Sequence, residues 1–392
     1  MRLILHDFAG HPFPVQLARA LAARGHTVLH LYAVANPTPK GALARRPSDA
    51  PGFTVEALGL GLAYARYDFV RRWRSERAYG RLLARRIAEW RPEAVLFCNT
   101  PLDVLAPAYR AAAAVGARPV LWVQDLLGLA ARRILGRTLP LIGGLIGRWH
   151  EAMERSFARR SHALVAITPD FVPILESWGV APQRIAVVPN WGPLDDIALG
   201  ATGNAWAREH GLGTRPVFLY TGMMGLKHDP GLVRALARHL AGRADVVVIS
   251  EGRGAEILAS ARAGDGLDNL TVLPFQPYGR LGEVLAAGDV MLAVLEAEAG
   301  VFAVPSKILG YLCAGRPVLA ALPAENQAAR LLLETGAGIV VPPGDETGWL
   351  RAADRLLTDE ALRARMGAAG RAHAERAFRI EDIARRFEAV LA

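Results

Sequence analysis

The chain has 392 residues, of which 52% are hydrophobic, and at this length two domains of roughly 200 residues are expected rather than one core. The composition has no low-complexity tract, so a disordered chain is not expected. The sequence has no run of ~20 apolar residues, so no membrane-spanning helix is predicted. The formal net charge of +9 favours an anionic partner: nucleic acid, a phosphorylated substrate or anionic lipid.

Cysteine usage and the first residues predict a cytoplasmic protein. Cys98 and Cys313 lie in apolar stretches without metal-ligand spacing, which indicates buried, inert thiols in a reducing compartment. The opening "MRLILHDFAG" has too short an apolar run for a signal peptide, so we interpret it as a first strand.

Strand and helix signals alternate through the first half of the chain. An apolar strand is predicted over Arg2–His6, a turn at Gly10 and a helix over Val15–Arg24. Further strands are predicted at Val28–Tyr32, Val95–Asn99, Val120–Val123, Ala163–Thr168 and Arg184–Val188. This alternation is typical of a parallel sheet covered by helices on both faces.

The segment Tyr64–Arg91 is strongly basic, with nine arginines against three acidic residues. Apolar and aromatic residues recur through it at near-helical spacing, which predicts an amphipathic helix. Such a helix can lie on an anionic bilayer, helped here by the apolar stretch "LPLIGGLIG" (Leu139–Gly147). It can equally be a core helix with a solvated arginine face, and the sequence leaves both interpretations open.

The stretch Val187–Asp196, "VVPNWGPLDD", breaks the first alternation, and a second begins at Val217. Strands are predicted at Val217–Thr221, Val246–Ser250, Leu270–Pro274, Asp289–Val294, Pro317–Ala321 and Gly338–Val341, with helices from Asp229 and Ser306 and a charged helical tail from Thr347. The predicted fold class is therefore α/β, with two Rossmann-like, doubly wound domains at 1–190 and 195–375. Residues 376–392 are expected as a helix packing back toward the first domain. Ligands of such sheets bind outside the carboxyl ends of the strands, so we expect the two domains to face a common cleft.

The stretch Phe218–Val233, "FLYTGMMGLKHDPGLV", predicts a glycine-rich turn between a strand and a helix. Gly222 and Gly225 let a ligand approach the backbone, and Asp229 followed by proline is a sound helix start. Lys227 and the helix amides would attract phosphate oxygens. The spacing is neither the Walker nor the Rossmann pattern, and by itself it also fits a tight turn with a solvated lysine.

A second lysine opens the helix within "VFAVPSKILGYLCAGRPVLAA" (residues 301–321). Ser306 is a plausible N-cap, and Lys307 lies in the first turn, where a cation is unfavourable with the helix dipole. A phosphate bound at that helix start would account for the lysine. Two lysines at two helix starts indicate a diphosphate.

Polar residues in other strand-end loops extend the candidate site. Glu251 and Arg253 follow one strand of the second half, while Glu296 and Glu298 follow another and would accept hydrogen bonds from sugar hydroxyls, unless they are merely solvated. In the first half, polar residues at two strand ends suit a hydroxyl-bearing acceptor: Asp7, Gly10, His11, Gln124 and Asp125. A lone histidine such as His11 is also often structural.

The sequence lacks the motifs of several other reaction and binding types. The sequence has no G-x-S-x-G elbow, no credible Cys/His nucleophile pair and no metal-binding cluster, so neither a metal nor a cofactor is expected. It also lacks stacking aromatics in a recognisable nucleic-acid module, so no nucleic-acid partner is expected.

Taken together, four stretches resemble glycosyltransferase family 4, retaining enzymes of the GT-B fold: "GHPFPVQLARALAARGHTV", "RIAVVPNW", "YTGMMGLKHDPGLV" and "VPSKILGYLCAGRPVLA". With "YGRLLARRI" and "WVQDL", they are most similar to the bacterial colanic-acid and exopolysaccharide branch. The resemblance implies transfer of a hexosyl or N-acetylhexosaminyl group from a nucleotide-diphosphate sugar to a glycan, commonly polyprenyl-diphosphate-linked. It places the donor in the C-terminal half and the acceptor against the N-terminal half. Such an enzyme would work at the inner face of the cell membrane.

The resemblance carries residue roles with it. It carries over Gly10, Gly222, Lys227, Ser306 and Lys307 to the donor phosphates, and with the residue arguments above the catalytic candidates are Lys227, Lys307, His11 and Asp125. The donor-binding candidates are Gly10, Gly222, Gly225, Lys227, Glu251, Arg253, Glu298, Ser306 and Lys307. The acceptor-side candidates are Asp7, His11, Gln124 and Asp125, the last two in a loop where many relatives place a histidine.

Gly310 departs from the family, because relatives usually carry there the second glutamate of a Glu-x7-Glu signature, which grips the donor ribose. Either the glutamate was simply lost, or the missing side chain makes room for the donor, with Glu296 or Glu298 taking over the ribose. Two other functions are also considered: a UDP-sugar 2-epimerase, and a non-catalytic nucleotide-sugar-binding partner subunit.

Overall fold

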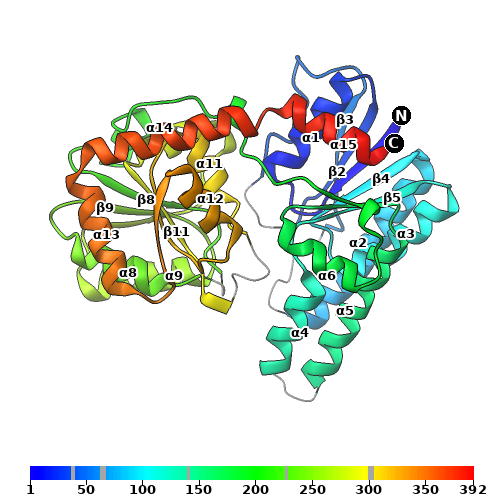
Figure 1. The fold of residues 1–392 in the computed structure, drawn as a ribbon, viewed down its shortest axis with the longest axis horizontal. Coiled ribbons are helices and arrows are strands. Elements are labelled where there is room, and N and C mark those ends of the chain that lie inside the picture. The colour runs from blue at the N-terminus through cyan, green and yellow to red at the C-terminus, as the bar shows by residue number, and fades with distance from the viewer. Residues whose placement is uncertain (37–39, 62–67, 139–141, 226–227, 299–303) are drawn as a thin grey trace. The chain divides into compact units, whose positions relative to one another are not determined.

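The computed structural model describes residues 1–36, 40–61, 68–138, 142–225, 228–298 and 304–392. The chain divides into two compact units (Figure 1). Unit 1 comprises Met1–Pro189 and Ile380–Ala392, and unit 2 comprises Asn190–Arg379. Both units are built around a parallel sheet with flanking helices, which confirms the predicted α/β class and its two Rossmann-like sheets.

The described residues of unit 1 form a seven-stranded sheet in the order β3-β2-β1-β4-β5-β6-β7, with every neighbouring pair parallel. The strands are β1 Arg2–Asp7, β2 Thr27–Ala33, β3 Phe53–Leu58, β4 Ala94–Cys98, β5 Arg118–Val123, β6 Ala163–Ala166 and β7 Ile185–Val187. The helices are α1 Pro12–Ala23, α2 Phe69–Trp90, α3 Leu102–Ala114, α4 Leu127–Thr138, α5 Ile142–Arg160, α6 Val172–Ser177 and α15 Ile380–Leu391, with 3-10 turns at Pro169–Phe171 and Pro182–Arg184.

The described residues of unit 2 form a six-stranded parallel sheet in the order β10-β9-β8-β11-β12-β13. The strands are β8 Val217–Thr221, β9 Asp245–Ile249, β10 Leu270–Leu273, β11 Val290–Val294, β12 Val318–Ala321 and β13 Gly338–Val341. The helices are α7 Ala205–Glu209, α8 Pro230–His239, α9 Arg253–Asp265, α10 Leu281–Ala287, α11 Lys307–Cys313, α12 Gln327–Thr335, α13 Glu346–Thr358 and α14 Glu360–Ala377, with 3-10 turns at Leu194–Asp196 and Tyr278–Arg280.

Both sheets reverse their strand order at one place. In unit 1 the chain winds outward in opposite directions from β1 and β4, and in unit 2 from β8 and β11. In open α/β sheets ligands bind outside the carboxyl ends of the strands at such a switch point. The loops after β1, β4, β8 and β11 are therefore where a ligand is expected.

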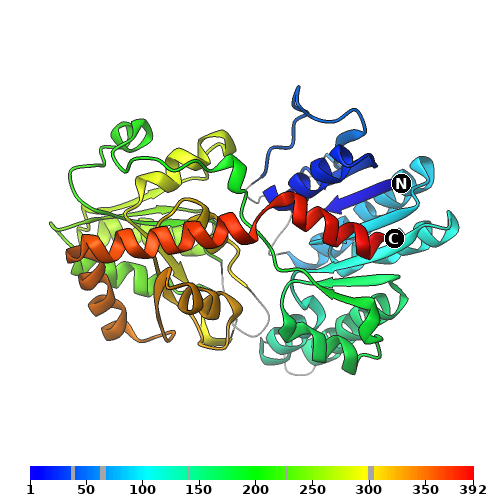
Figure 2. The same ribbon diagram turned by 45° about the horizontal axis from the view of Figure 1, so that its top comes forward.

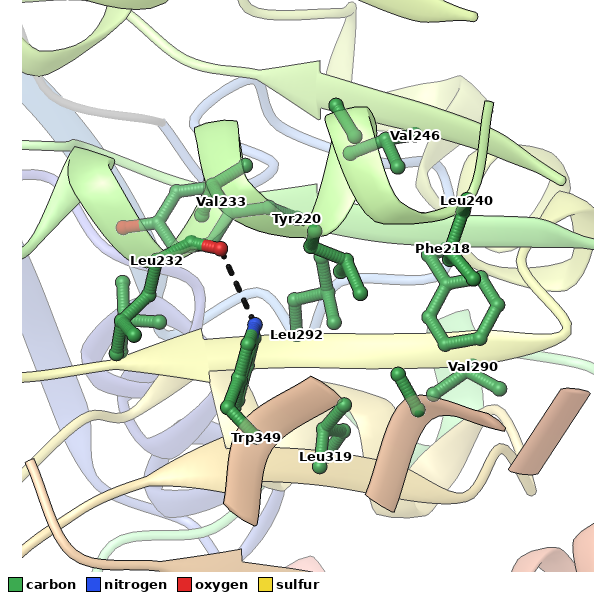
Figure 3. Close-up of a cluster of buried hydrophobic side chains, with 14 of the residues drawn as sticks. Phe218, Tyr220, Leu232, Val233, Leu240, Val246, Val290, Leu292, Leu319 and Trp349 are labelled. Carbon is green, nitrogen blue, oxygen red and sulfur yellow. Dashed lines mark hydrogen bonds between the residues drawn. The ribbon is translucent and has the colours of Figure 1, made fainter. Parts of the chain in front are cut away.

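The core of unit 2 shows how apolar strand sequences become central strands (Figure 3). β9 and β11 are buried along their whole length, as expected for parallel strands covered on both faces. Trp349 of α13 lies fully buried against this sheet, and its indole Nε1 donates to the Leu232 carbonyl at 3.2 Å. The buried indole therefore keeps its hydrogen bond while it fills the core.

The C-terminal helix α15 is part of unit 1, where it lies beside α1 (Figures 1 and 2). Phe387 is fully buried and its ring meets Trp122 at 4.7 Å between centroids. Glu388 pairs with Arg24 at 2.6 Å and with His26 at 2.9 Å. Apolar and charged contacts thus join the two ends of the chain within one unit.

The apolar residues of helix α2 differ in exposure along the length of the helix. Leu83 and Ile87 are fully buried in the core of unit 1, whereas Phe69 is 67% and Trp73 41% exposed. The second half of α2 is thus a core helix, and its first turns present apolar side chains to solvent. Tyr64–Tyr67, the start of the predicted basic segment, lies outside the described residues.

No helix in the described part of the chain is both long enough and apolar enough to span a bilayer.

Candidate functional site

The loop after β8 brings Gly222 and Lys307 together. Gly222 has a positive φ of 99°, a conformation that glycine adopts without strain. A Cβ built on Gly222 would lie 3.4 Å from Cε and 3.7 Å from Nζ of Lys307. The ammonium of Lys307 also lies 3.4 Å from the centroid of the Tyr220 ring, a cation–π contact. A positive charge is therefore held at the carboxyl end of β8.

Tyr311 fixes the end of β8 from α11. Its hydroxyl accepts a hydrogen bond from the Thr221 backbone amide at 3.0 Å and donates toward the Leu292 carbonyl at 3.3 Å. Helix α11 is thereby tied to both strands of the switch point, β8 and β11. This contact keeps Lys307, one turn earlier on α11, beside Gly222.

Lys227 lies outside the described residues, but the residues on either side of it are placed. The Gly225 amide donates to Nδ1 of His228 at 3.1 Å, so a buried histidine pins the end of the glycine-rich turn. Asp229 caps α8 as predicted, accepting from the Gly231 amide at 2.7 Å. The turn therefore leads directly into a ten-residue helix, α8, whose amides can attract an anion.

Ser306 stands at the N-cap of α11, yet among the described residues its side chain makes no capping hydrogen bond. Its backbone is helical there, with φ −61° and ψ −21°, instead of the extended conformation of a capping residue. The expected capping role is therefore wrong for this conformation, although the position at the helix start is as predicted. Its exposed side chain is accessible to a ligand.

Glu251 and Arg253 flank Gly252 in the loop after β9, and both side chains are exposed. The Glu251 carbonyl accepts from the Met224 amide at 3.5 Å, and the Met224 carbonyl accepts from the Gly254 amide at 3.0 Å. The β9 loop thus packs against the β8 loop. This places Glu251 and Arg253 next to the turn that contains Gly222 and Gly225.

Glu296 and Glu298 follow β11 and are both exposed. Partial burial raises the pKa of Glu296, and the neighbouring negative charges of Asp229 and Glu298 raise it further. The two acids therefore lie on the same edge of the sheet as the start of α8. Residues 299–303, which continue this loop, are outside the described residues.

Gly310 faces apolar side chains of its own unit. A Cβ built there would lie 3.6 Å from Leu285 Cδ1 and 3.9 Å from Ile197 Cδ1, ordinary van der Waals distances. The backbone of α11 therefore has room for a methyl group at this position.

In unit 1, Asp7 organises the loop after β1. Its carboxylate is fully buried and accepts from the amides of Ala9 at 3.1 Å and His11 at 2.6 Å. Asn99 adds a side-chain hydrogen bond at 3.0 Å from the end of β4, where it adopts a left-handed φ of 47°. Burial raises the pKa of Asp7, and these hydrogen bonds oppose the rise. Asp7 is thus placed to position the Gly10 turn, since its own oxygens are occupied by the protein.

Gly10 and His11 form the turn itself. Gly10 has a φ of 73° and is overlaid by Lys40, whose Cδ would lie 3.0 Å from a Cβ at this position. His11 occupies the N-cap of α1 and its ring stacks on Phe13 at 5.8 Å. Lys40 was not predicted from the sequence, because no local motif marks it.

Gln124 and Asp125 follow β5, as predicted, and both are partly buried. The Gln124 side chain hydrogen-bonds the thiol of Cys98, the last residue of β4. Asp125 lies near Glu154, whose carboxylate accepts from the amides of Leu127 and Gly128 at the start of α4, each at 2.9 Å. Burial raises the pKa of Glu154 to about 7.

Within the described ranges, no group of three or more histidine, cysteine, aspartate or glutamate side chains could hold a metal ion. What the two switch points do offer is polar loops, two glycine turns with positive φ, and lysine ammonium groups. Such a set can bind phosphates and sugar hydroxyls.

Comparison with known proteins assigns families to the two units. Residues 11–191 match the family model described as a glycosyl transferase 4-like domain, and residues 215–359 match that of the glycosyl transferases group 1. Together these matches span more than half of the chain.

Two curated relatives carry the name D-inositol 3-phosphate glycosyltransferase. The protein from Stackebrandtia nassauensis is 30% identical over 250 residues, covering 57% of this chain and 52% of that protein. The protein from Xylanimonas cellulosilytica is 28% identical over 236 residues, covering 57% and 55%. The matched region is thus only about half the length of these relatives.

Several solved structures have the same fold as this chain over its whole length, although their sequence identity to it is low. Sucrose-phosphate synthase from Thermosynechococcus elongatus has a TM-score of 0.72 at 16% identity, covering 100% of this chain and 98% of the other. Anabaena HepE, solved in complex with UDP-glucose, has a TM-score of 0.72 at 14% identity, covering 100% and 99%. At these identities the likeness establishes the architecture alone.

Proposed function

The chain belongs to the glycosyltransferases of family 4 and has their GT-B fold, and from this premise we propose that it transfers a sugar from a nucleotide-diphosphate donor. The donor site is the edge of unit 2 formed by the loops after β8, β9 and β11. The observation that carries this assignment is the ammonium of Lys307 held beside Gly222 at the switch point. Similar folds solved with UDP and UDP-glucose support a uridine nucleotide as the first candidate.

The proposed mechanism is electrostatic. When the bond between the sugar and the diphosphate breaks, negative charge grows on the departing nucleotide. Lys307 and the first amides of α8 would offset this charge from fixed positions, so the protein need not reorganise during the reaction, and Lys227 is proposed to add a second positive charge. The resemblance to retaining enzymes implies attack from the same face of the sugar. The proposed mechanism uses no carboxylate of the described part of unit 2 as a nucleophile.

Unit 1 is proposed to bind the acceptor through its switch-point loops. His11, Gln124 and Asp125 are the proposed contacts, and Asp7 holds the Gly10 turn in place. A polyprenyl-diphosphate-linked glycan in cell-surface or exopolysaccharide synthesis is the acceptor that the sequence resemblance favours. The curated relatives, named for D-inositol 3-phosphate, favour a small phosphorylated acceptor instead. Both candidate acceptors are anionic.

Unit 1 is also proposed to rest on an anionic membrane. Large apolar side chains are exposed on the first turns of α2 and on α5: Phe69, Val70, Trp73, Leu145, Ile146 and Trp149. Both stretches belong to unit 1, and the charge of Glu76 on α2 acts on His150 of α5. The exposed guanidinium of Arg71, on the same turns of α2, suits contact with acidic headgroups. This surface would hold the enzyme near a lipid-linked acceptor.

The donor assignment is tested by measuring UDP affinity in lysine variants. Lys307→Ala and Lys227→Ala should each weaken UDP binding by roughly 1.5–3 kcal/mol, the size of a charge-assisted hydrogen bond. Arg262→Ala on α9 removes a cation outside the site and serves as the control. Unchanged affinity in both lysine variants, with folding intact, would contradict the assignment.

Incubation with UDP-, GDP- and dTDP-sugars separates the remaining functions. A transferase slowly releases the nucleotide, and a 2-epimerase isomerises the sugar. A non-catalytic binding subunit does neither.

A further inference from the structure

Lysine is rare in this chain. Of 46 basic residues, only Lys40, Lys227 and Lys307 are lysines, and all others are arginines. Arginine serves the ordinary ion pairs, such as Arg19 with Asp49 at 2.7 Å. Because the planar guanidinium and the compact ammonium are not interchangeable, these three positions are the ones where the chain presents a compact ammonium. Two of the three lysines are already assigned to the donor phosphates.

The third lysine, Lys40, lies at the carboxyl ends of the strands in the sheet of unit 1. The Nζ of Lys40 donates to the carbonyl oxygens of Ala9 at 2.9 Å and Ala33 at 3.2 Å. These carbonyls belong to the end of β2 and the loop after β1. Lys40 therefore crosses the carboxyl ends of two neighbouring strands, directly beside the switch point of unit 1.

Gly10 and Lys40 fit together closely. A Cβ at Gly10 would lie 3.0 Å from Cδ and 3.4 Å from Nζ of Lys40, and the Gly41 amide donates to the Gly10 carbonyl at 2.8 Å. The side chain is thus held across the turn by contacts on both sides. A guanidinium is larger and planar, so it would not occupy the same space between the two carbonyls.

We propose that Lys40 is a third ligand-contacting lysine, whose ammonium binds a phosphate oxygen at the β1 edge of unit 1. An ammonium has three N–H donors, and in the described part of the chain two carbonyl oxygens account for two of them. The third N–H would donate to the ligand. This proposal rests on the proposed function, since the phosphate is that of a phosphorylated acceptor bound by unit 1.

The local charges agree with a bound anion. The side chain is half-buried; burial lowers the pKa of Lys40, and the charge of Asp7 opposes the change. The Asp7 carboxylate is itself fully buried and accepts amide hydrogen bonds, so it is turned into the protein. Lys40 is therefore a half-buried cation at this turn, and a bound phosphate would act in the same direction as Asp7 by favouring the charged ammonium.

Because the chain has only three lysines, lysine-specific labelling tests the proposal directly. Protein labelled with carbon-13 only at lysine Cε should give three side-chain NMR signals, and Lys40→Arg and Lys307→Arg assign two of them by loss. UDP should shift the Lys307 signal, which belongs to the proposed donor site of unit 2. Inorganic phosphate added to the UDP-saturated protein should shift the Lys40 signal, which belongs to the proposed phosphate site of unit 1. Lys40→Met should weaken the binding that moved the signal by about tenfold, and Lys40→Arg should not restore it.

Different results would contradict the proposed donor site at Lys307 and the proposed phosphate site at Lys40. A Lys307 signal that ignores UDP contradicts the proposed donor site. A Lys307 signal that moves while Lys40 stays unchanged under both additions overturns the inference, and Lys40 is then a clamp between two loops. A melting temperature lowered in Lys40→Met, with ligand affinity unchanged, overturns the inference as well.

Discussion

At the residue scale, Gly310 is the position where the sequence resemblance leads us to expect a glutamate. A helix interior is a costly place for glycine, and the structure shows ordinary contact distances for an added methyl group. The neighbouring Lys307 and Tyr311 both reach the end of β8, so α11 is engaged at the switch point on either side of Gly310. A side chain added at Gly310 would point toward Leu285 and Ile197 within its own unit.

Gly310→Ala should stabilise the protein by roughly 0.5–1 kcal/mol, because alanine favours the helix and the methyl group meets no close neighbour. If the donor uses this space, the same variant should bind UDP-sugar more weakly. Melting temperature and donor affinity are measured on one sample. A stabler protein with unchanged affinity would show that the space around Gly310 is not used.

Two buried histidines of unit 1 predict a pH-dependent stability. Burial lowers the pKa of His6 and of His30 to about 3 from the ordinary 6.5. Both rings therefore stay neutral in the folded protein, whereas the unfolded chain takes up protons below pH 6.5. Because the unfolded state binds more protons there, stability falls as pH decreases from 6.5 toward 3.

His30→Leu isolates one of these contributions. Among the described residues neither nitrogen of His30 has a hydrogen-bond partner, so the substitution breaks no hydrogen bond that the structure contains. Below pH 6.5 the variant should lose less stability than the parent protein, by up to about 1.4 kcal/mol per pH unit. Urea unfolding at pH 7.5 and 5.5 measures the difference, with the exposed His162→Gln as control. Parallel pH dependences in parent and His30→Leu would contradict the explanation.

At the element scale, α15 shows how a distant segment completes a unit. Its buried face packs on α1 and β6 of unit 1, and Phe387 fills a space beside Trp122. The amphipathic sequence of α15 indicates a helix but does not identify the surface it covers. That surface is decided by the fit of Phe387 and by the Arg24 and His26 pairs with Glu388.

Phe387→Ala should destabilise unit 1 by roughly 3–5 kcal/mol, since it leaves a cavity between α15 and the sheet. Arg385→Ala, on the exposed face of the same helix, should change stability by no more than about 0.5 kcal/mol. Urea unfolding followed by circular dichroism compares the two variants. Equal effects would mean that α15 does not contribute to the core.

At the scale of the whole molecule, charge and exposed apolar area predict a peripheral association. The chain carries a net charge of +9, and the exposed apolar residues of α2 and α5 lie on the same unit as its most basic segment. Each arginine near an anionic surface contributes about 1 kcal/mol, and salt screens this attraction.

Binding to phosphatidylserine vesicles should therefore be measurable at low salt and fall as salt increases. Arg71→Glu with Arg74→Glu should reduce the bound fraction strongly, and Trp73→Ser should reduce it without changing its salt dependence. Arg351→Glu with Arg355→Glu on α13 is the charge-matched control. Sedimentation with anionic and neutral vesicles measures these fractions. No binding to anionic vesicles at low salt would leave α2 as a core helix with a solvated face.

Much of the fold could be predicted from local patterns. The bounds of β8 and β13 agree with the sequence prediction, because each is a short apolar run with a clear stop. β3 was missed: it is the edge strand of its sheet, and its alternating sequence has only two fully buried residues. The capping bond expected of Ser306 was also wrong, since a helix start depends on backbone angles that residue type alone does not determine.

By itself, the sequence determined the α/β class, the two sheets, the family and the loops in which a site would lie, because strand periodicity, helix caps and glycine turns are local properties. Only the tertiary structure decided which residues meet: Tyr220 beneath Lys307, Tyr311 on Thr221, and Lys40 across Gly10. These pairs come from different loops and helices, and for most of them no motif fixes the spacing. They come together because parallel strands deliver all their carboxyl ends to one edge of a sheet, where residues distant in sequence become neighbours.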